Sequence, residues 1–126
     1  MKGNFDSSAP IFMQIMEQML NDIANGSLAP GEKVAPVRQL AADYKVNPNT
    51  MQKSLEKLGD MGFLYTERTS GRFVTDDVEK IATLRQKIPN DITHNYVQEM
   101  LDFGISPTDI GGYVQKNLNE RNVNND

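Results

Sequence analysis

The feature that most constrains the fold is a pair of amphipathic segments in the middle of the chain. Apolar residues recur at helical spacing over residues 36–44 and again over residues 48–61. The second segment opens with Asn47 and Pro48, a side chain that caps helices followed by a residue that fits the first helical turn. Residues 45–47 form the link between the two segments, and two helices joined by so short a link match the helix-turn-helix pattern.

The residues that follow this pair predict a β-hairpin. Residues 63–66 and residues 73–74 are rich in aromatic and β-branched side chains, and the polar stretch 67–72 between them contains Gly71. A helix-turn-helix followed at once by a hairpin is the outline of a winged helix. We therefore expect a mainly α fold with a small β-hairpin wing.

Helical patterns flank this region on both sides. An apolar face over residues 10–24 predicts a helix before it. After the hairpin we expect three further helices, the first ending before Pro89 and the second at Gly104. The sequence thus predicts a winged helix-turn-helix over residues 1–76 and a short C-terminal helical dimerisation segment over residues 77–126.

Composition excludes several classes of protein. The 126 residues include no Cys and one His, which excludes disulfides and thiolate catalysis and argues against a zinc site. No nucleophile–base pair or phosphate loop is recognisable, so we expect no enzyme activity, no metal and no cofactor. The start of the chain has no signal-peptide pattern, and no apolar run approaches the roughly 20 residues that span a bilayer. We expect a cytoplasmic protein with no membrane partner.

Net charge is misleading until it is divided by segment. The whole chain carries −4, which by itself argues against nucleic acid. Residues 30–75, however, contain seven basic and five acidic side chains and carry +2, whereas both flanks are acidic. The basic part of the chain therefore coincides with the predicted helix-turn-helix and wing.

The solvent face of the second predicted helix carries side chains that can read DNA. In a helix-turn-helix this helix lies in the major groove, and its first residues meet the base edges. Asn49 and Gln52 have amides that can bond bidentately to adenine, and Lys53 can donate to guanine or to phosphate. The alternative is that Asn47 only caps the helix and that the rest is an ordinary solvated face.

Basic residues outside that helix favour DNA binding. Arg68 and Arg72 flank the small residues of the hairpin turn, where a guanidinium can enter a narrow minor groove or bind phosphate. Arg38 and Lys53 are expected to project towards the same side. The predicted DNA-binding residues are Arg38, Asn47, Asn49, Thr50, Gln52, Lys53, Arg68, Thr69, Ser70, Gly71 and Arg72.

Short motifs occur in a fixed order along residues 10–75. They are Pro10-Ile11-Phe12, Pro30-Gly31, Val37-Arg38-Gln39-Leu40-Ala41, Asn47-Pro48-Asn49-Thr50, Gly62-Phe63-Leu64 and Gly71-Arg72-Phe73-Val74. This order resembles the GntR family of winged-helix transcriptional regulators, and the helix opening at Asn47 with the short helical tail is similar to the YtrA subfamily. The resemblance implies a double-stranded DNA operator as partner, and repression by analogy. It also places Arg38 on DNA, the recognition helix 48–61 in the major groove and the wing 67–72 in the minor groove.

The segment after the hairpin is expected to bind a second copy of the chain. With only about fifty residues it is too small to enclose a sizeable ligand pocket, and the sequence identifies no small-molecule effector. In the resembling subfamily this region forms a two-fold dimer, which would read a pseudo-palindromic operator. The predicted dimerisation residues are Tyr96, Met100, Leu101, Phe103, Ile110, Tyr113, Val114 and Leu118.

Two alternatives to this account follow from the same residues. The C-terminal helices can instead pack on the winged helix of their own chain. The winged helix can also serve as a protein–protein interaction module that does not bind DNA, which the acidic total charge would suit.

Overall fold

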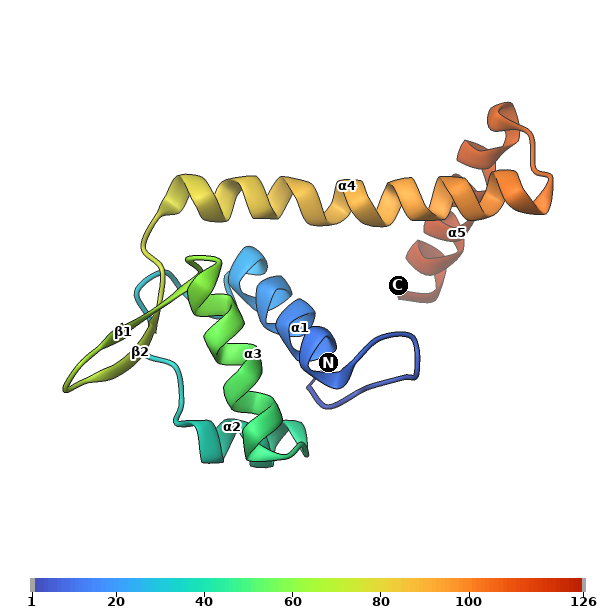
Figure 1. The fold of residues 1–126 in the computed structure, drawn as a ribbon. Helices are drawn as coiled ribbons and strands as arrows, with labels where there is room; N and C mark the ends of the chain where they lie inside the picture. The colour runs from blue at the N-terminus through green and yellow to red at the C-terminus, as the bar shows by residue number, and fades with distance from the viewer. Residues whose placement is uncertain (1, 126) are drawn as a thin grey trace. The chain divides into compact units, whose positions relative to one another are not determined.

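The computed structural model describes the backbone of residues 2–125 and the side chains of residues 2–122. Its described part contains five helices and one two-stranded antiparallel hairpin (Figure 1). In chain order these are α1 (Ile11–Asn25), α2 (Val37–Tyr44), α3 (Pro48–Asp60), β1 (Leu64–Glu67), β2 (Gly71–Val74), α4 (Val78–Phe103) and α5 (Pro107–Asn125). The predicted fold class, mainly α with a β-hairpin wing, is confirmed. The chain divides into two compact units, Met1–Gln86 and Lys87–Asp126, which we describe separately.

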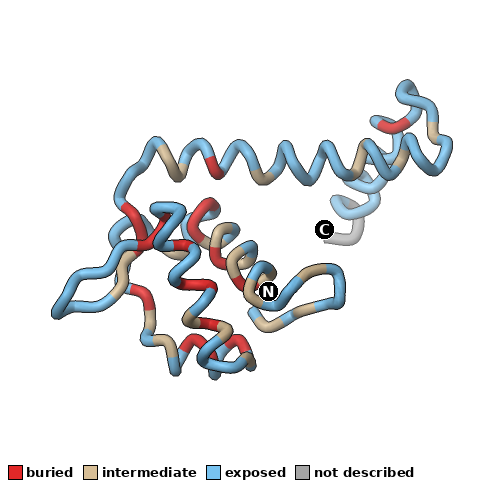
Figure 2. Tube along the Cα trace, in the orientation of Figure 1, coloured by how far each residue is buried: buried red, intermediate tan, exposed pale blue. Residues whose placement is uncertain are grey.

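The core of the first unit lies between α1, α2, α3 and the base of the hairpin (Figure 2). Each helix contributes one apolar face at helical spacing, and its other face is solvated. The core side chains of the helices, the hairpin and the segments that join them are Ile15, Met19, Ile23, Ala24, Val34, Leu40, Ala41, Tyr44, Met51, Leu55, Leu58, Phe63, Leu64 and Val74.

Local backbone chemistry sets the ends of α2 and α3. Lys45, at the end of α2, adopts a left-handed conformation with φ of 57°, which lets the chain turn at once into α3. At the end of α3 the amides of Gly62 and Phe63 bond to the carbonyls of Gly59 and Leu58, the pattern of a Schellman motif. The recognition helix predicted over residues 48–61 therefore ends one residue earlier, at Asp60.

The wing is a hairpin with a shorter turn than the sequence predicts. β1 and β2 pair with Glu67 opposite Gly71 and Thr66 opposite Arg72. The predicted wing tip over residues 67–72 thus consists of Arg68, Thr69 and Ser70, and the flanking residues belong to the strands. The turn is shorter because Gly71, with φ of 114°, takes a position in the strand pairing that another residue could adopt only with strain.

α4 corrects the prediction of a helix that ends before Pro89. The helix runs without interruption from Val78 to Phe103, with Pro89 inside it. Proline costs the helix one backbone hydrogen bond, about 3 kcal/mol, and the many backbone bonds of this long helix on both sides of Pro89 keep it continuous. The hydroxyl of Thr93 donates to the Pro89 carbonyl at 2.7 Å.

The first turns of α4 belong to the winged-helix unit and are fixed to it by hydrogen bonds. The Asp77 carboxylate accepts from the Lys80 amide at 3.1 Å and caps the helix. The Lys80 ammonium donates to the Met61 carbonyl and lies over the Phe63 ring. Arg85 donates to the Ala24 carbonyl at the end of α1, at 3.2 Å.

The second unit consists of the end of α4 and of α5, joined by a short turn. Gly104 closes α4 with φ of 102°, and its amide and that of Ile105 bond to the carbonyls of Leu101 and Met100. Among the described side chains of this unit, Ile110 is the one that is buried. Much of the apolar surface of this unit is therefore solvated in the single chain.

None of the helices within residues 2–125 combines the length and the apolar character that crossing a bilayer requires.

Tyr44 gives the first unit a pH dependence that can be measured. Burial of its ring, reinforced by the carboxylates of Asp22 and Asp43, raises the pKa of the phenol from 10.0 to about 12. Because the fold favours the neutral phenol, its contribution to stability is complete below pH 10 and is lost as the pH rises through about 12.

We expect the free energy of unfolding to fall between pH 10 and about 12 as Tyr44 ionises. Tyr44→Phe should remove the part of this fall that comes from the phenol. Urea denaturation of both proteins at a series of pH values measures the difference. An equal decline in the two proteins would contradict the assignment.

Candidate nucleic-acid interface

The packing of α3 determines which of its side chains face solvent. Met51, Leu55 and Leu58 are buried against the other helices, which turns Asn49, Lys53 and Glu56 outward and leaves Gln52 half-buried. The exposed polar face thus extends along the helix from its first turn.

Ser54 fixes the position of α3 against α1. The residue is completely buried, and its hydroxyl lies 2.9 Å from the Phe12 carbonyl and 3.1 Å from the Thr50 carbonyl. A buried hydroxyl with such partners stabilises one relative placement of the two helices. The sequence analysis did not identify this contact, because a Ser in a helix carries no signal of its tertiary partner.

Asn47 is engaged in capping the helix. Its side-chain oxygen accepts a hydrogen bond from the Asn49 amide at 2.7 Å, as expected for a residue before a first-turn proline. The predicted capping role is therefore confirmed. A contact between Asn47 and DNA stays a prediction.

Two further contacts orient side chains of the polar face. The Lys53 ammonium lies 3.9 Å from the centre of the Phe12 ring, so the side chain leans towards the start of α1. The Gln52 side-chain nitrogen donates to a Glu56 carboxylate oxygen at 2.8 Å. The Lys53 side chain thus contacts α1, and the Gln52 side chain contacts the next turn of α3.

The two faces of the wing differ in character. Tyr65 and Phe73 stack on one face with their ring centres 5.6 Å apart. Thr66 and Arg72 project from the other face, where they line a shallow groove together with Glu56 and Asp60 of α3. The groove thus lies between the recognition helix and the wing, and Arg72 is part of its wall.

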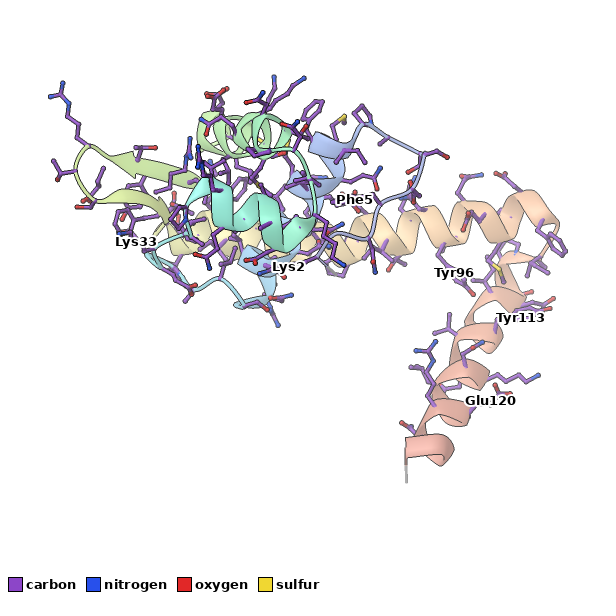
Figure 3. The ribbon with its side chains drawn as sticks, turned by 90° about the horizontal axis from the view of Figure 1, so that it is seen from below. Lys2, Phe5, Lys33, Tyr96, Tyr113 and Glu120 are labelled. Atoms are coloured by element: carbon purple, nitrogen blue, oxygen red, sulfur yellow. The ribbon has the colours of Figure 1, made fainter. Side chains whose placement is uncertain are left out.

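Lys33 is a basic residue of this region that the sequence analysis did not assign to the site. Its backbone forms an isolated bridge with Phe73, so it lies beside β2, and Figure 3 labels it there. The Lys33 Cε is 3.3 Å from the position that a Cβ would take on Gly71. The net positive charge of residues 30–75 indicated that basic residues lie near the site. The short stretch around Lys33 has no helical or strand pattern, so the sequence did not predict where its side chain lies.

The remaining predicted residues are not brought together by any contact, and all of them are exposed except Thr50, which is half-buried. Arg38 is exposed in the first turn of α2, while Arg68, Thr69 and Ser70 are exposed at the hairpin turn. Among the described side chains no group of three or more acidic or histidine residues is placed to hold a metal ion.

Comparison with known proteins identifies the fold and the class of protein. The family model for bacterial regulatory proteins of the gntR family matches residues 13–74, which include α2, α3 and the wing. The uncharacterized HTH-type transcriptional regulator YhcF of Bacillus subtilis is 32% identical over 84% of this chain and 88% of its own length. This chain belongs to the GntR family. It is a DNA-binding transcriptional regulator, and the family consists of regulators rather than enzymes.

Two further proteins resemble this GntR chain, one over part of its length and one over most of it. The HTH-type transcriptional repressor YtrA of Bacillus subtilis is 36% identical over 58% of this chain and 56% of its own length. A GntR family transcriptional regulator from Listeria monocytogenes has a solved structure with a TM-score of 0.81 and 35% identity, and the match covers 89% of this chain and 98% of that one. The resemblance to the YtrA subfamily is confirmed.

One solved structure shows a related domain bound to DNA. The DNA-binding domain of AraR in complex with operator ORE1 has a TM-score of 0.52 and 26% identity. The match covers 60% of this chain and 94% of the AraR domain.

Proposed function

We propose that this GntR regulator is a homodimeric repressor that reads a pseudo-palindromic operator in double-stranded DNA. The observation that carries the proposal is the combined surface of the first unit. An exposed polar face of α3 and a hairpin with basic side chains flank one groove, and that groove contains Arg72. The repressor name of YtrA and the operator complex of AraR support the direction of regulation and the class of ligand.

The contacts divide into those that read bases and those that bind the backbone. Asn49, Thr50 and Gln52 are assigned to base edges in the major groove, since α3 presents them near its first turns. Lys33, Lys53 and Arg38 are assigned to phosphates. Arg68 and its neighbours Thr69, Ser70, Gly71 and Arg72 are assigned to the minor groove, where Arg72 contacts the phosphates that border it.

The second unit supplies the dimer interface in this proposal. Phe103 is 85% exposed, and Leu118 and Tyr113 are 52% and 47% exposed. Such apolar side chains are stabilised when a second copy covers them, and a two-fold dimer makes the same patch on each copy contact itself. The predicted interface residues Leu101 and Val114 are also exposed, whereas Tyr96 and Met100 are half-buried.

Ile110 has a different part in the second unit. It is already buried within its own chain, so little of its surface is left for a partner to cover. Figure 3 shows Tyr96 on α4 and Tyr113 on α5, the two aromatic residues that it labels in this unit. The proposal assigns residues 1–76 to DNA binding and residues 77–126 to dimerisation, in a cytoplasmic protein.

Two substitutions test the division of contacts. Gln52→Ala is expected to change base preference at one position of each half-site, with a loss of about 1–3 kcal/mol of discrimination. Arg72→Ala is expected to weaken binding on all duplexes to a similar degree. Selection from a random duplex library, followed by binding measurements on the enriched site, distinguishes the two effects.

The same selection tests the alternative of a protein-binding winged helix. A wild-type protein that enriched no sequence and bound no duplex at low salt would refute the proposed function. A Gln52→Ala motif identical to the wild-type motif would refute the placement of α3 in the groove.

A further inference from the structure

Glu56 has a place in the recognition helix that the assigned DNA contacts do not explain. It is exposed on the same face as Asn49 and Lys53, one turn after Gln52, and it lines the groove between α3 and the wing. An acidic side chain on a surface that meets phosphate is unfavourable unless it has a specific task, because like charges repel.

The structure shows what Glu56 contacts. One of its carboxylate oxygens accepts a hydrogen bond from the Gln52 side-chain nitrogen at 2.8 Å. Hydrogen bonds to a carboxylate are stronger than bonds between neutral groups, so this contact fixes the amide orientation. Gln52 is also half-buried, which restricts the rotamers that it can adopt.

The fixed amide has a definite chemical consequence. A glutamine amide has two N–H donors and one carbonyl acceptor. To bind adenine it needs one donor for N7 and one acceptor for the N6 amino group, whereas guanine offers the two acceptors N7 and O6. With one N–H already donated to Glu56, the remaining donor and acceptor still match adenine, but two free donors are no longer available for guanine.

We propose that Glu56 is a positioning residue that makes Gln52 read adenine and reject guanine. The inference rests on the proposed function, since it needs α3 in the major groove, and it adds the base that this position selects. The carboxylate itself need not touch DNA.

Random-site selection with a matched set of variants tests the inference. Gln52→Ala first identifies the operator position that Gln52 contacts, which is expected to be adenine in the wild-type motif. Glu56→Ala is expected to broaden that position to adenine or guanine, reducing a discrimination of at least about fivefold to less than about twofold. Glu56→Gln keeps an oxygen acceptor for the Gln52 amide, and it should retain most of the preference.

The controls separate failure of the inference from failure of the proposed function. Glu17→Ala removes an exposed acid of α1 and should leave the motif unchanged, and circular dichroism shows that each variant is folded. A wild-type protein that enriches no motif refutes the proposed function. A wild-type motif without adenine at the Gln52 position, an unchanged Glu56→Ala motif, or an equal loss in Glu56→Gln and Glu56→Ala overturns the inference alone.

Discussion

Replacing both Tyr113 and Leu118 with Glu is expected to convert the dimer to a monomer and to weaken operator binding by about 100-fold or more. Both side chains are about half exposed in the single chain, so we expect the substitutions to leave α5 folded. In a dimer each chain would bury two unpaired charges in an apolar interface, which is strongly unfavourable. Each monomer would then bind one half-site without the help of its partner.

Light scattering measures the first effect directly. The wild-type chain of 14.1 kDa is expected to scatter with about twice that mass, and the double variant with the mass of one chain. Lys116→Glu on the same helix is a matched control, because Lys116 is exposed and lies outside the predicted interface residues. A wild-type monomer, or a double variant that remained dimeric, would show that another surface pairs the chains or that none does.

Leu58→Ala is expected to lower the free energy of unfolding of the winged-helix unit by about 2–5 kcal/mol. Leu58 is completely buried at the end of α3, and its carbonyl accepts the Phe63 amide where the chain turns towards β1. Truncation leaves a cavity at the junction of α3 with the wing. Since the recognition helix and the wing both depend on this junction, operator binding should fall as the unit unfolds.

Urea denaturation at neutral pH measures the loss of stability. Lys57→Ala, one residue earlier and exposed, is expected to change the free energy of unfolding by less than about 0.5 kcal/mol. A loss below about 1 kcal/mol for Leu58→Ala would mean that this site relaxes and that the junction is not tightly packed.

Local sequence chemistry was sufficient to predict the elements of the winged helix. The apolar spacing of α1, α2 and α3 and the Asn47-Pro48 opening are signals that act within a few residues. Pro89 shows where such signals mislead. The local rule for proline predicts a break, but the backbone hydrogen bonds on both sides of Pro89 keep one continuous α4.

The details of the site depend on contacts between residues that are distant in sequence. The Ser54 hydroxyl and the Lys53 ammonium both meet Phe12 of α1, and no pattern within α3 indicates that partner. Lys33 lies beside the wing through an isolated β-bridge to Phe73. A single bridge involves too few residues to produce a periodic sequence pattern. Residue types and their approximate face were therefore predictable, but their orientation was not.

The salt dependence of operator binding tests the central claim most directly. Titration of the wild-type dimer on its enriched site is expected to give a slope of log affinity against log salt steeper than about −4, since each phosphate contact contributes roughly −0.9. Arg72→Ala should reduce the steepness by about 2 for the dimer, whereas Arg121→Ala on α5 should leave it unchanged. A slope near zero, or no duplex binding at low salt, would contradict the account.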